Sequence, residues 1–197
     1  MKSVLISIQP KWVEKIANGE KTIEVRKTAP KEVPFRVYVY NTKGAVKELC
    51  VDEDGQYWRL TKCKVIGEFI CDNVITVDCD SIAPFNPKTN EYIEEETCLN
   101  RTEFIRYTNF KKALGWHISD LKIYDKPKEL SEFYYCCKEM KANEPRAGKY
   151  VSLSCYACRH NALKRTEDYS EYNNMLGYIC KRNITRPPSN WCYVEEL

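Results

Sequence analysis

The sequence predicts an α+β fold, in which a small β-barrel with flanking helices is followed by a small, cysteine-rich C-terminal module. Three observations predict it. The first 135 residues arrange short strand-like runs around two helical segments, in an order that begins β-α-β-β. Hydrophobic residues make up 43% and charged residues 30% of the 197 residues, which is typical of a folded globular chain. Cysteines near the C-terminus are spaced like metal ligands.

The first half of the chain contains one helix and several strands. Val4–Ile8 predicts a short buried strand, and Pro10 suits the start of a helix that Asn18-Gly19 ends. Residues 21–27 and 35–43 alternate in polarity and predict two further strands. The remaining expected elements are a hairpin over 45–63 that turns at Asp54-Gly55, and a long strand over 64–77 with Gly67 as a bulge.

The second half contains the closing elements of the domain. Residues 79–100 are acidic and irregular, and residues 102–114 predict a helix that stops at Gly115. Residues 116–127 predict a strand with a register change near Ser119-Asp120. The expected division is a domain over 1–135, a polar linker over 136–149 that contains Pro and Gly, and a tail over 150–197.

The charge distribution is uneven along the chain. Residues 1–47 carry ten Lys and Arg against four Glu, and residues 48–100 carry four basic against twelve acidic residues. A basic N-terminal part suits a partner that carries phosphate, whereas the acidic middle argues against a protein that coats nucleic acid over its whole surface. No apolar run is long enough for a membrane helix, and the N-terminus lacks a signal-peptide pattern, so we expect a cytoplasmic protein.

The stretch Gly19–Lys27, GEKTIEVRK, concentrates charge on one short turn and strand. Alternation places Thr22, Glu24 and Arg26 on one face. The guanidinium of Arg26 suits a phosphate or a carbonyl edge, and the ammonium of Lys21 adds a point charge. A carboxylate between such cations can accept a hydrogen bond from a base amino group or a ribose hydroxyl.

The segment ISIQPKWVEKIANGEKTIEVRK, with its G-x-K-T-x-E-x-R motif, resembles the ASCH domain of the PUA-like superfamily of small β-barrels. WHISDLKIYDKPKELSEF resembles the closing strand of phage- and bacterial-type ASCH proteins, and the resemblance covers roughly residues 1–133. It implies a cleft beside the barrel that binds RNA or a modified nucleotide or nucleoside. The expected ligand-binding residues are Lys11, Lys21, Thr22, Glu24 and Arg26.

The resemblance also implies an alternative, a hydrolase. Relatives similar to the bacterial acetylcytidine amidohydrolase use a Lys, which maps onto Lys21, and a nucleophilic Thr, whose position holds Glu24. Glu24 can instead serve as a general base on water while Lys21 polarises a carbonyl, or it can form a salt bridge in a charged rim. The catalytic Glu of these relatives has candidates by location in residues 94–96. A ribonuclease that uses the same cleft is the other enzymatic alternative.

The C-terminal cysteines predict a structural zinc site. Cys155 and Cys158 are separated by two residues, and Cys180 and Cys192 follow. Two thiolates from one tight turn and two later thiolates complete a tetrahedron, and four thiolate ligands leave no open position for catalysis. His160 competes for the fourth position. The zinc would stabilise a segment that has too little hydrophobic core to fold alone.

Three further features have alternative interpretations. Trp12 can stack on a base, but its helical spacing with Ile16 favours the core. His117 is expected to be a core or rim residue rather than a catalyst. The tail can instead contact a protein through exposed Arg182, Arg186 and Trp191. Other cysteines, Cys136-Cys137 included, are expected to be packed or exposed thiols.

Overall fold

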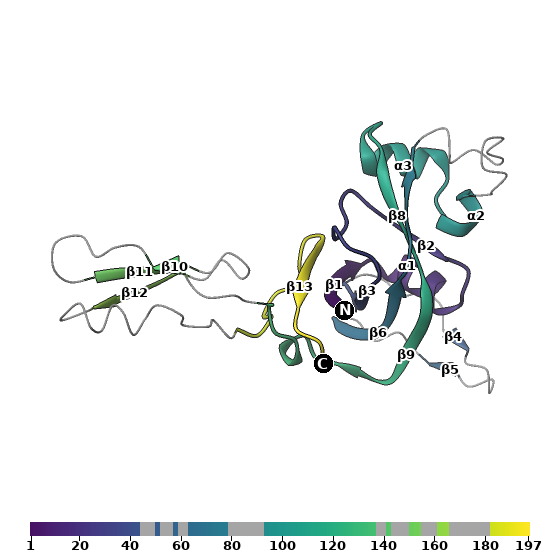
Figure 1. Cartoon of the computed structure of the whole chain (residues 1–197). Helices are drawn as coiled ribbons and strands as arrows, with labels where there is room; N and C mark the ends of the chain where they lie inside the picture. The colour runs from purple at the N-terminus through teal and green to yellow at the C-terminus, as the bar shows by residue number, and fades with distance from the viewer. Residues whose placement is uncertain are drawn as a thin grey trace. The chain divides into compact units, whose positions relative to one another are not determined.

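The computed structural model describes residues 1–43, 50–51, 57–58, 63–78, 93–136, 141–142, 150–154, 161–165 and 182–197 (Figure 1). The chain divides into two compact units. Unit 1 comprises residues 1–130 together with 186–192, and unit 2 comprises residues 131–185 together with 193–197. Segment 186–192 therefore belongs to the same unit as the N-terminal domain, although it comes from the far end of the chain.

Unit 1 is an α+β structure, as the sequence predicts. Its five-stranded sheet has the order β13-β1-β3-β6-β9, in which β1 and β3 run parallel and β3, β6 and β9 are antiparallel neighbours. Its three-stranded sheet has the antiparallel order β2-β8-β7. The five strands are β1 (Lys2–Ile8), β3 (Phe35–Asn41), β6 (Lys64–Cys71), β9 (Ser119–Lys128) and β13 (Trp191–Val194), of which Trp191 and Cys192 belong to unit 1. The three strands are β2 (Ile23–Arg26), β7 (Val74–Val77) and β8 (Ala113–His117).

Neither sheet closes on itself among the described strands, so the barrel stays a prediction. The hairpin expected over 45–63 is represented by an antiparallel pair, β4 (Cys50–Val51) and β5 (Tyr57–Trp58). The predicted turn at Asp54-Gly55 lies outside the described residues.

The predicted long strand over 64–77 is two strands. The chain leaves the five-stranded sheet after Cys71 and joins the three-stranded sheet at Val74. The break at Asp72-Asn73 could not be predicted from the hydrophobic pattern, because the apolar residues on both sides of it continue the same alternation. The expected irregularity at Gly67 is confirmed, because the register of β6 shifts beside it and a side chain there would collide with the main-chain oxygen of Lys122.

In the described part of unit 1, three helices accompany the sheets: α1 (Pro10–Ala17), α2 (Ile93–Thr97) and α3 (Arg101–Thr108). As predicted, α1 begins at Pro10 and is followed by Gly19 with a left-handed backbone, φ +74°. No helix among the described residues has the length and apolar character that crossing a membrane requires.

The predicted end of the third helix at Gly115 is wrong. α3 begins at Asn100, whose side chain and that of Glu103 form a reciprocal capping box, and it ends at Asn109 with φ 55°. Asn109 tolerates the left-handed conformation that ends a helix, which makes a later glycine unnecessary. Gly115 instead lies within β8.

Gly115 is expected to tolerate no side chain. A methyl group there would lie 2.8 Å from Cγ2 of Ile23 and 3.0 Å from side-chain atoms of Ile75 and Val77. We expect Gly115→Ala to lower the free energy of unfolding by about 1–3 kcal/mol, because overpacking displaces the strands on both sides of β8. Urea unfolding tests this prediction, and an unchanged midpoint at constant m-value would contradict it.

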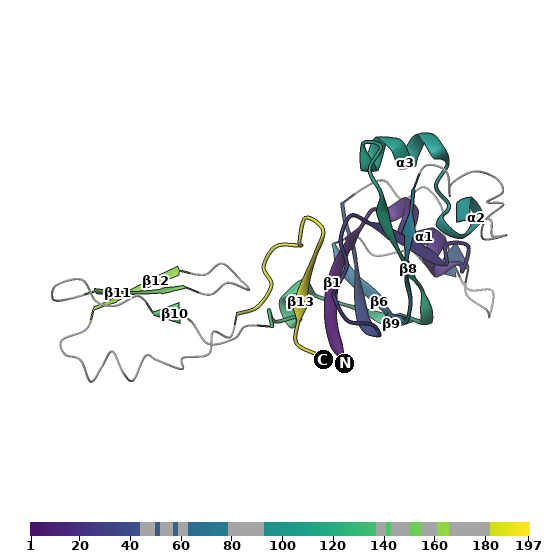
Figure 2. The same cartoon turned by 45° about the horizontal axis from the view of Figure 1, so that its top comes forward.

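The polar face expected on β2 is not solvated. All four residues of β2 are buried, so Glu24 and Arg26 are as inaccessible as Ile23 and Val25. On its apolar side, Val25 joins a core cluster with Val77, Leu99, Phe104 and Ala113. Figure 2 shows α3 beside the end of β8, and this helix contributes Phe104 to the cluster.

Unit 2 begins with a short 3-10 helix, η1 (Leu130–Glu132), the last two residues of which belong to it. Phe133 and Ile184 are buried, and the amide of Ile184 donates to the carbonyl of Phe133 at 2.8 Å. A three-stranded antiparallel sheet follows with the order β10 (Lys141–Ala142), β11 (Tyr150–Ser154) and β12 (Asn161–Arg165). Cys155, Cys158, His160 and Cys180 lie outside the described residues.

Candidate ligand pocket

Unit 1 contains a pocket of about 790 Å³ at the carboxyl end of β1. Its walls come from the junction of β1 and α1, from β2, from α3 and from the segment that precedes β13. The lining residues are Ser7, Ile8, Gln9, Lys11, Trp12, Lys21, Glu24, Val25, Arg26, Thr42, Leu99, Glu103, Arg106, Tyr107, Pro187, Pro188 and Ser189.

Three charged side chains form the buried part of the pocket. The side chains of Lys21, Glu24 and Arg26 are 2%, 7% and 9% exposed. One oxygen of the Glu24 carboxylate lies 3.5 Å from Nζ of Lys21, and the other lies 3.0 Å from Nε of Arg26. The Nε–H bond of Arg26 does not point at the carboxylate, so this contact is an ion pair rather than a hydrogen bond. Two buried cations therefore share one carboxylate.

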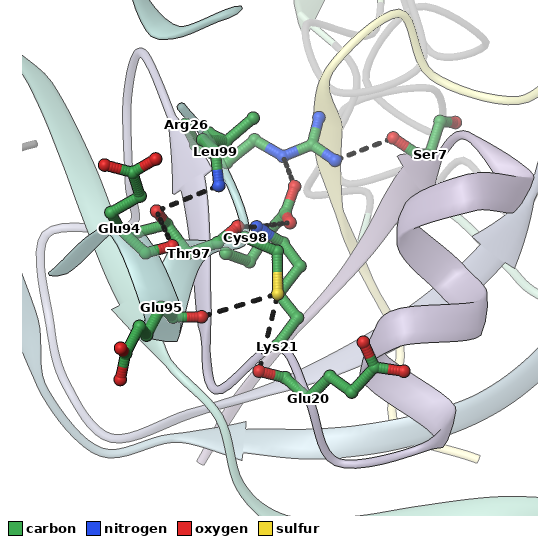
Figure 3. A network of polar contacts seen from close by, with 10 residues as sticks. Ser7, Glu20, Lys21, Arg26, Glu94, Glu95, Thr97, Cys98 and Leu99 are labelled. Atoms are coloured by element: carbon green, nitrogen blue, oxygen red, sulfur yellow. Dashed lines mark hydrogen bonds and ion pairs between the residues drawn. The ribbon is translucent and has the colours of Figure 1, made fainter. Parts of the chain in front are cut away.

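Arg26 is held by main-chain and side-chain acceptors. Its Nη2 donates to the carbonyl of Ser7 at 2.7 Å, and its Nη1 donates to Oδ1 of Asn190 at 3.2 Å (Figure 3 shows the Ser7 contact). These partners fix the plane of the guanidinium. Each Nη still carries one further N–H, so the fork retains donors for a ligand.

Lys21 is positioned by the end of α2. Its Nζ donates to the carbonyl of Thr97 (Figure 3). The amide of the next residue, Thr22, donates to the carbonyl of Glu96 at 2.9 Å. The Cys98 thiol, 3.4 Å from the carbonyl of Glu20, adds a third contact between α2 and this segment. Burial lowers the pKa of Lys21, although Glu24 opposes that effect.

The rim of the pocket combines aromatic rings with cations. Nζ of Lys11 lies 2.9 Å from the carboxylate of Glu103 and 4.0 Å from the centroid of the Trp12 ring. Tyr107 lies on α3 beside Arg106, and burial raises the pKa of its hydroxyl. Arg106 also lies at the rim, where the hydrogen bond from Lys11 and the charge of Arg106 both lower the pKa of the Glu103 carboxyl.

Four of the five predicted ligand-binding residues line this pocket: Lys11, Lys21, Glu24 and Arg26. Thr22 does not line it, because β2 begins only at Ile23 and the alternation of side chains does not extend back through Thr22. Trp12 combines both of its interpretations, since it lines the pocket and also packs against the core cluster.

The acidic run over 94–96 does not line the pocket. Glu94, Glu95 and Glu96 lie on α2, which supplies main-chain carbonyls to Lys21 and Thr22 rather than a carboxylate. The carboxylate that does reach the rim is Glu103, which the sequence analysis did not select. The one sequence feature that involves Glu103 is the capping box, in which Asn100 is followed three residues later by Glu103. This pattern predicts the start of a helix but not a pocket.

The other predicted candidates lie elsewhere. His117 is exposed, and its Nδ1 lies 2.6 Å from a carboxylate oxygen of Asp72. Trp191, expected to be exposed, is half-buried and packs edge-on against Trp116 with ring centroids 6.1 Å apart. Arg182 and Arg186 are exposed, as the protein-contact alternative requires.

The described ranges contain no group of three side chains that could hold a metal ion. Of the four predicted zinc ligands, Cys192 alone lies within these ranges, where it is half-buried. Cys136 is an exposed free thiol. The zinc site therefore stays a prediction.

No protein-family model matches the chain. No curated protein matches it either. Among solved structures, the chain is similar to ASCH from Zymomonas mobilis, with 21% identity and a TM-score of 0.45, over 66% of this chain and 74% of that one. It is similar to a mutant of the same Zymomonas mobilis protein with 19% identity and a TM-score of 0.47, over 66% of this chain and 77% of that one.

Proposed function

We propose that this chain is an ASCH-type protein that binds one nucleotide unit, either free or within RNA, in the pocket of Lys21, Glu24 and Arg26. The proposal includes a PUA-like barrel, in which the two sheets of unit 1 are the two halves. The chain passes between these sheets four times, from β1 to β2, from β2 to β3, at Asp72-Asn73 and at Ile118. The G-x-K-T-x-E-x-R motif supports the family, and its charged residues converge on the pocket.

The charge imbalance in the buried part of the pocket carries the proposal. Lys21 and Arg26 share Glu24, so one positive charge has no counter-charge among the lining residues that surround it. An isolated buried charge is costly, and an anionic or electron-rich ligand would offset that cost. Arg106 adds a second cation at the rim.

The size of the pocket and its aromatic lining indicate the chemical class of the ligand. A pocket of about 790 Å³ is within the usual range for small-molecule and cofactor sites. Trp12 and Tyr107 offer ring faces on which a base can stack. Glu24 can accept from an exocyclic amino group, and the free N–H groups of Arg26 can donate to a base carbonyl. A nucleotide combines these features with a phosphate.

The test is a calorimetric titration with the four nucleoside 5′-monophosphates, the four nucleosides and a mixed single-stranded RNA pool, each at two salt concentrations. The Lys21→Ala/Arg26→Ala double variant is compared with Lys126→Ala, which removes an exposed cation that does not line the pocket. We expect salt-dependent binding that the double variant loses and the Lys126 variant keeps. Absence of binding to every probe by the intact protein would refute the proposal.

Arg106→Ala is expected to weaken binding of a nucleoside monophosphate about tenfold, because one charge-assisted hydrogen bond to phosphate is lost. Binding of the matching nucleoside is expected to stay within about twofold. Calorimetry with the nucleoside and its monophosphate measures both values. An equal loss for the two ligands would show that Arg106 does not contact the phosphate.

A second candidate, a hydrolase on an acyl-modified nucleoside, is favoured by one observation. Lys21 is buried, its pKa is lowered, and its Nζ lies 3.5 Å from the Glu24 carboxylate. A lysine of this kind can polarise a carbonyl while the carboxylate activates water. Incubation with N4-acetylcytidine, followed by chromatography for cytidine and acetate, tests this candidate. Product that forms with the wild type and not with Glu24→Gln supports it.

We also propose that Cys155, Cys158, Cys180 and Cys192 bind one structural zinc ion. The spacing of the four cysteines supports this proposal. Elemental analysis of the purified protein is expected to find one zinc per chain, and a Cys155→Ser/Cys158→Ser variant is expected to lose it. A wild-type protein purified without chelator that contains no zinc would contradict the proposal.

A further inference from the structure

The C-terminal segment Arg186–Cys192, which is part of unit 1, is held beside the pocket by several hydrogen bonds and a ring contact. Nε1 of Trp191 lies 3.2 Å from the carbonyl oxygen of Thr28 and 3.1 Å from its hydroxyl oxygen. The Trp191 ring packs against Trp116, which is completely buried. The amide of Ser7 donates to the carbonyl of Asn190 at 3.3 Å. These contacts hold the segment against β1 and against the chain that follows β2.

Asn190 connects this segment to the buried charges. Its Oδ1 accepts from Nη1 of Arg26, and its Nδ2 donates to the hydroxyl of Thr28 at 3.3 Å. Arg26, Ser7 and Asn190 therefore form a closed ring of hydrogen bonds. In that ring Ser7 accepts from Nη2 of Arg26 and donates to the main chain of Asn190. The three residues just before Asn190, Pro187–Ser189, line the pocket.

We propose that Pro187–Ser189 form a permanent wall of the ligand pocket, and that Asn190, which follows them, is the positioning residue that orients Arg26 toward the ligand. This inference rests on the proposed function. The segment lies outside residues 1–133, which carry the motif resemblance, so the pocket of this chain is completed by its own C-terminal region. Two consecutive prolines restrict the backbone of the wall, which favours a fixed boundary for the ligand.

The test compares Asn190→Ala with Asn190→Asp. Alanine removes the acceptor of Arg26, whereas aspartate keeps it and can accept from the hydroxyl of Thr28 in place of donating to it. We expect Asn190→Ala to weaken binding of a nucleoside monophosphate and of the matching nucleoside about tenfold. Asn190→Asp is expected to keep the affinity for the uncharged nucleoside within about threefold of wild type, and to weaken binding of the monophosphate because its carboxylate neutralises the charge of Arg26. Equal affinity of the alanine variant and the wild type would overturn the proposal.

A double-mutant cycle with Arg26→Lys separates positioning from a general structural effect. Lysine keeps the charge but has no Nη1 for Asn190 to hold. If Asn190 acts through Arg26, adding Asn190→Ala to the Arg26→Lys variant is expected to change the affinity by less than about twofold. A full additional tenfold loss would show that Asn190 acts by another route.

A measurement on the ligand-free protein keeps the inference testable if no probe binds. Nitrogen-detected NMR of the Arg26 guanidinium reports how fast its Nη groups rotate. We expect faster rotation in Asn190→Ala than in the wild type, and slow rotation in Asn190→Asp. The same rotation rate in all three proteins would overturn the positioning role, whereas failure of every ligand to bind would overturn only the proposed function.

Discussion

Replacing Glu24 with alanine is expected to lower the free energy of unfolding by about 3–5 kcal/mol, because it leaves two buried cations without their shared counter-charge. Lys21 and Arg26 each lie within 3.5 Å of this carboxylate, and all three side chains are less than 10% exposed. Among the described lining residues, the other carboxylate is Glu103, which pairs with Lys11 at the rim and therefore does not replace that of Glu24.

Urea unfolding of both proteins at neutral pH measures this effect. Glu32→Ala is the matched control, because Glu32 also forms an ion pair, 2.8 Å from Nζ of Lys2, but on the exposed surface. Solvent screening makes such pairs contribute little, so the control is expected to unfold near the wild-type midpoint. If Glu24→Ala unfolded together with the control, the buried charges would have to be compensated in another way.

The motif strand shows how far the sequence predicts the site. The alternation in residues 21–27 correctly paired Glu24 with Arg26, because both lie within β2. It failed for Thr22, which precedes the first strand residue and does not line the pocket, although the neighbouring Lys21 does. There, the local chain path is set by contacts with α2, through the carbonyls of Glu96 and Thr97. Those partners lie 74 or more residues away in the sequence, so the local pattern of residues cannot predict these contacts.

The residues that sequence reasoning missed come from distant parts of the chain. Asn190 lies 164 residues after Arg26, and its hydrogen bond depends on the folding of β13 against β1. Arg106 and Tyr107 lie on a helix that was correctly expected, but their orientation toward the pocket depends on where that helix ends. Because α3 ends at Asn109 rather than Gly115, residues 113–117 form β8 and not a continuation of the helix.

Replacing Lys21 with methionine is expected to have little effect on stability and a large effect on binding. Removal of one cation leaves Glu24 and Arg26 as a balanced pair, so the free energy of unfolding at neutral pH is expected to fall by no more than about 1 kcal/mol, or to rise. Affinity for the nucleoside monophosphate is expected to fall at least about twentyfold, because a buried charged donor is lost. Calorimetry and urea unfolding measure the two quantities.

The pH dependence of the free energy of unfolding shows whether the effect of Lys21→Met on stability comes from the buried charge of Lys21 or from a loss of packing. Burial lowers the pKa of Lys21 in the folded state below the usual value of 10.5. Between the folded and the unfolded pKa values, the unfolded chain binds more protons, so this lysine contributes stability that increases with pH. The free energy of unfolding of the wild type, relative to Lys21→Met, is therefore expected to rise with pH in the range between the lowered pKa of Lys21 and pH 10.5. A difference that stays constant or falls over this range would mean that Lys21 keeps its proton in the pocket, held by Glu24 and the carbonyl of Thr97.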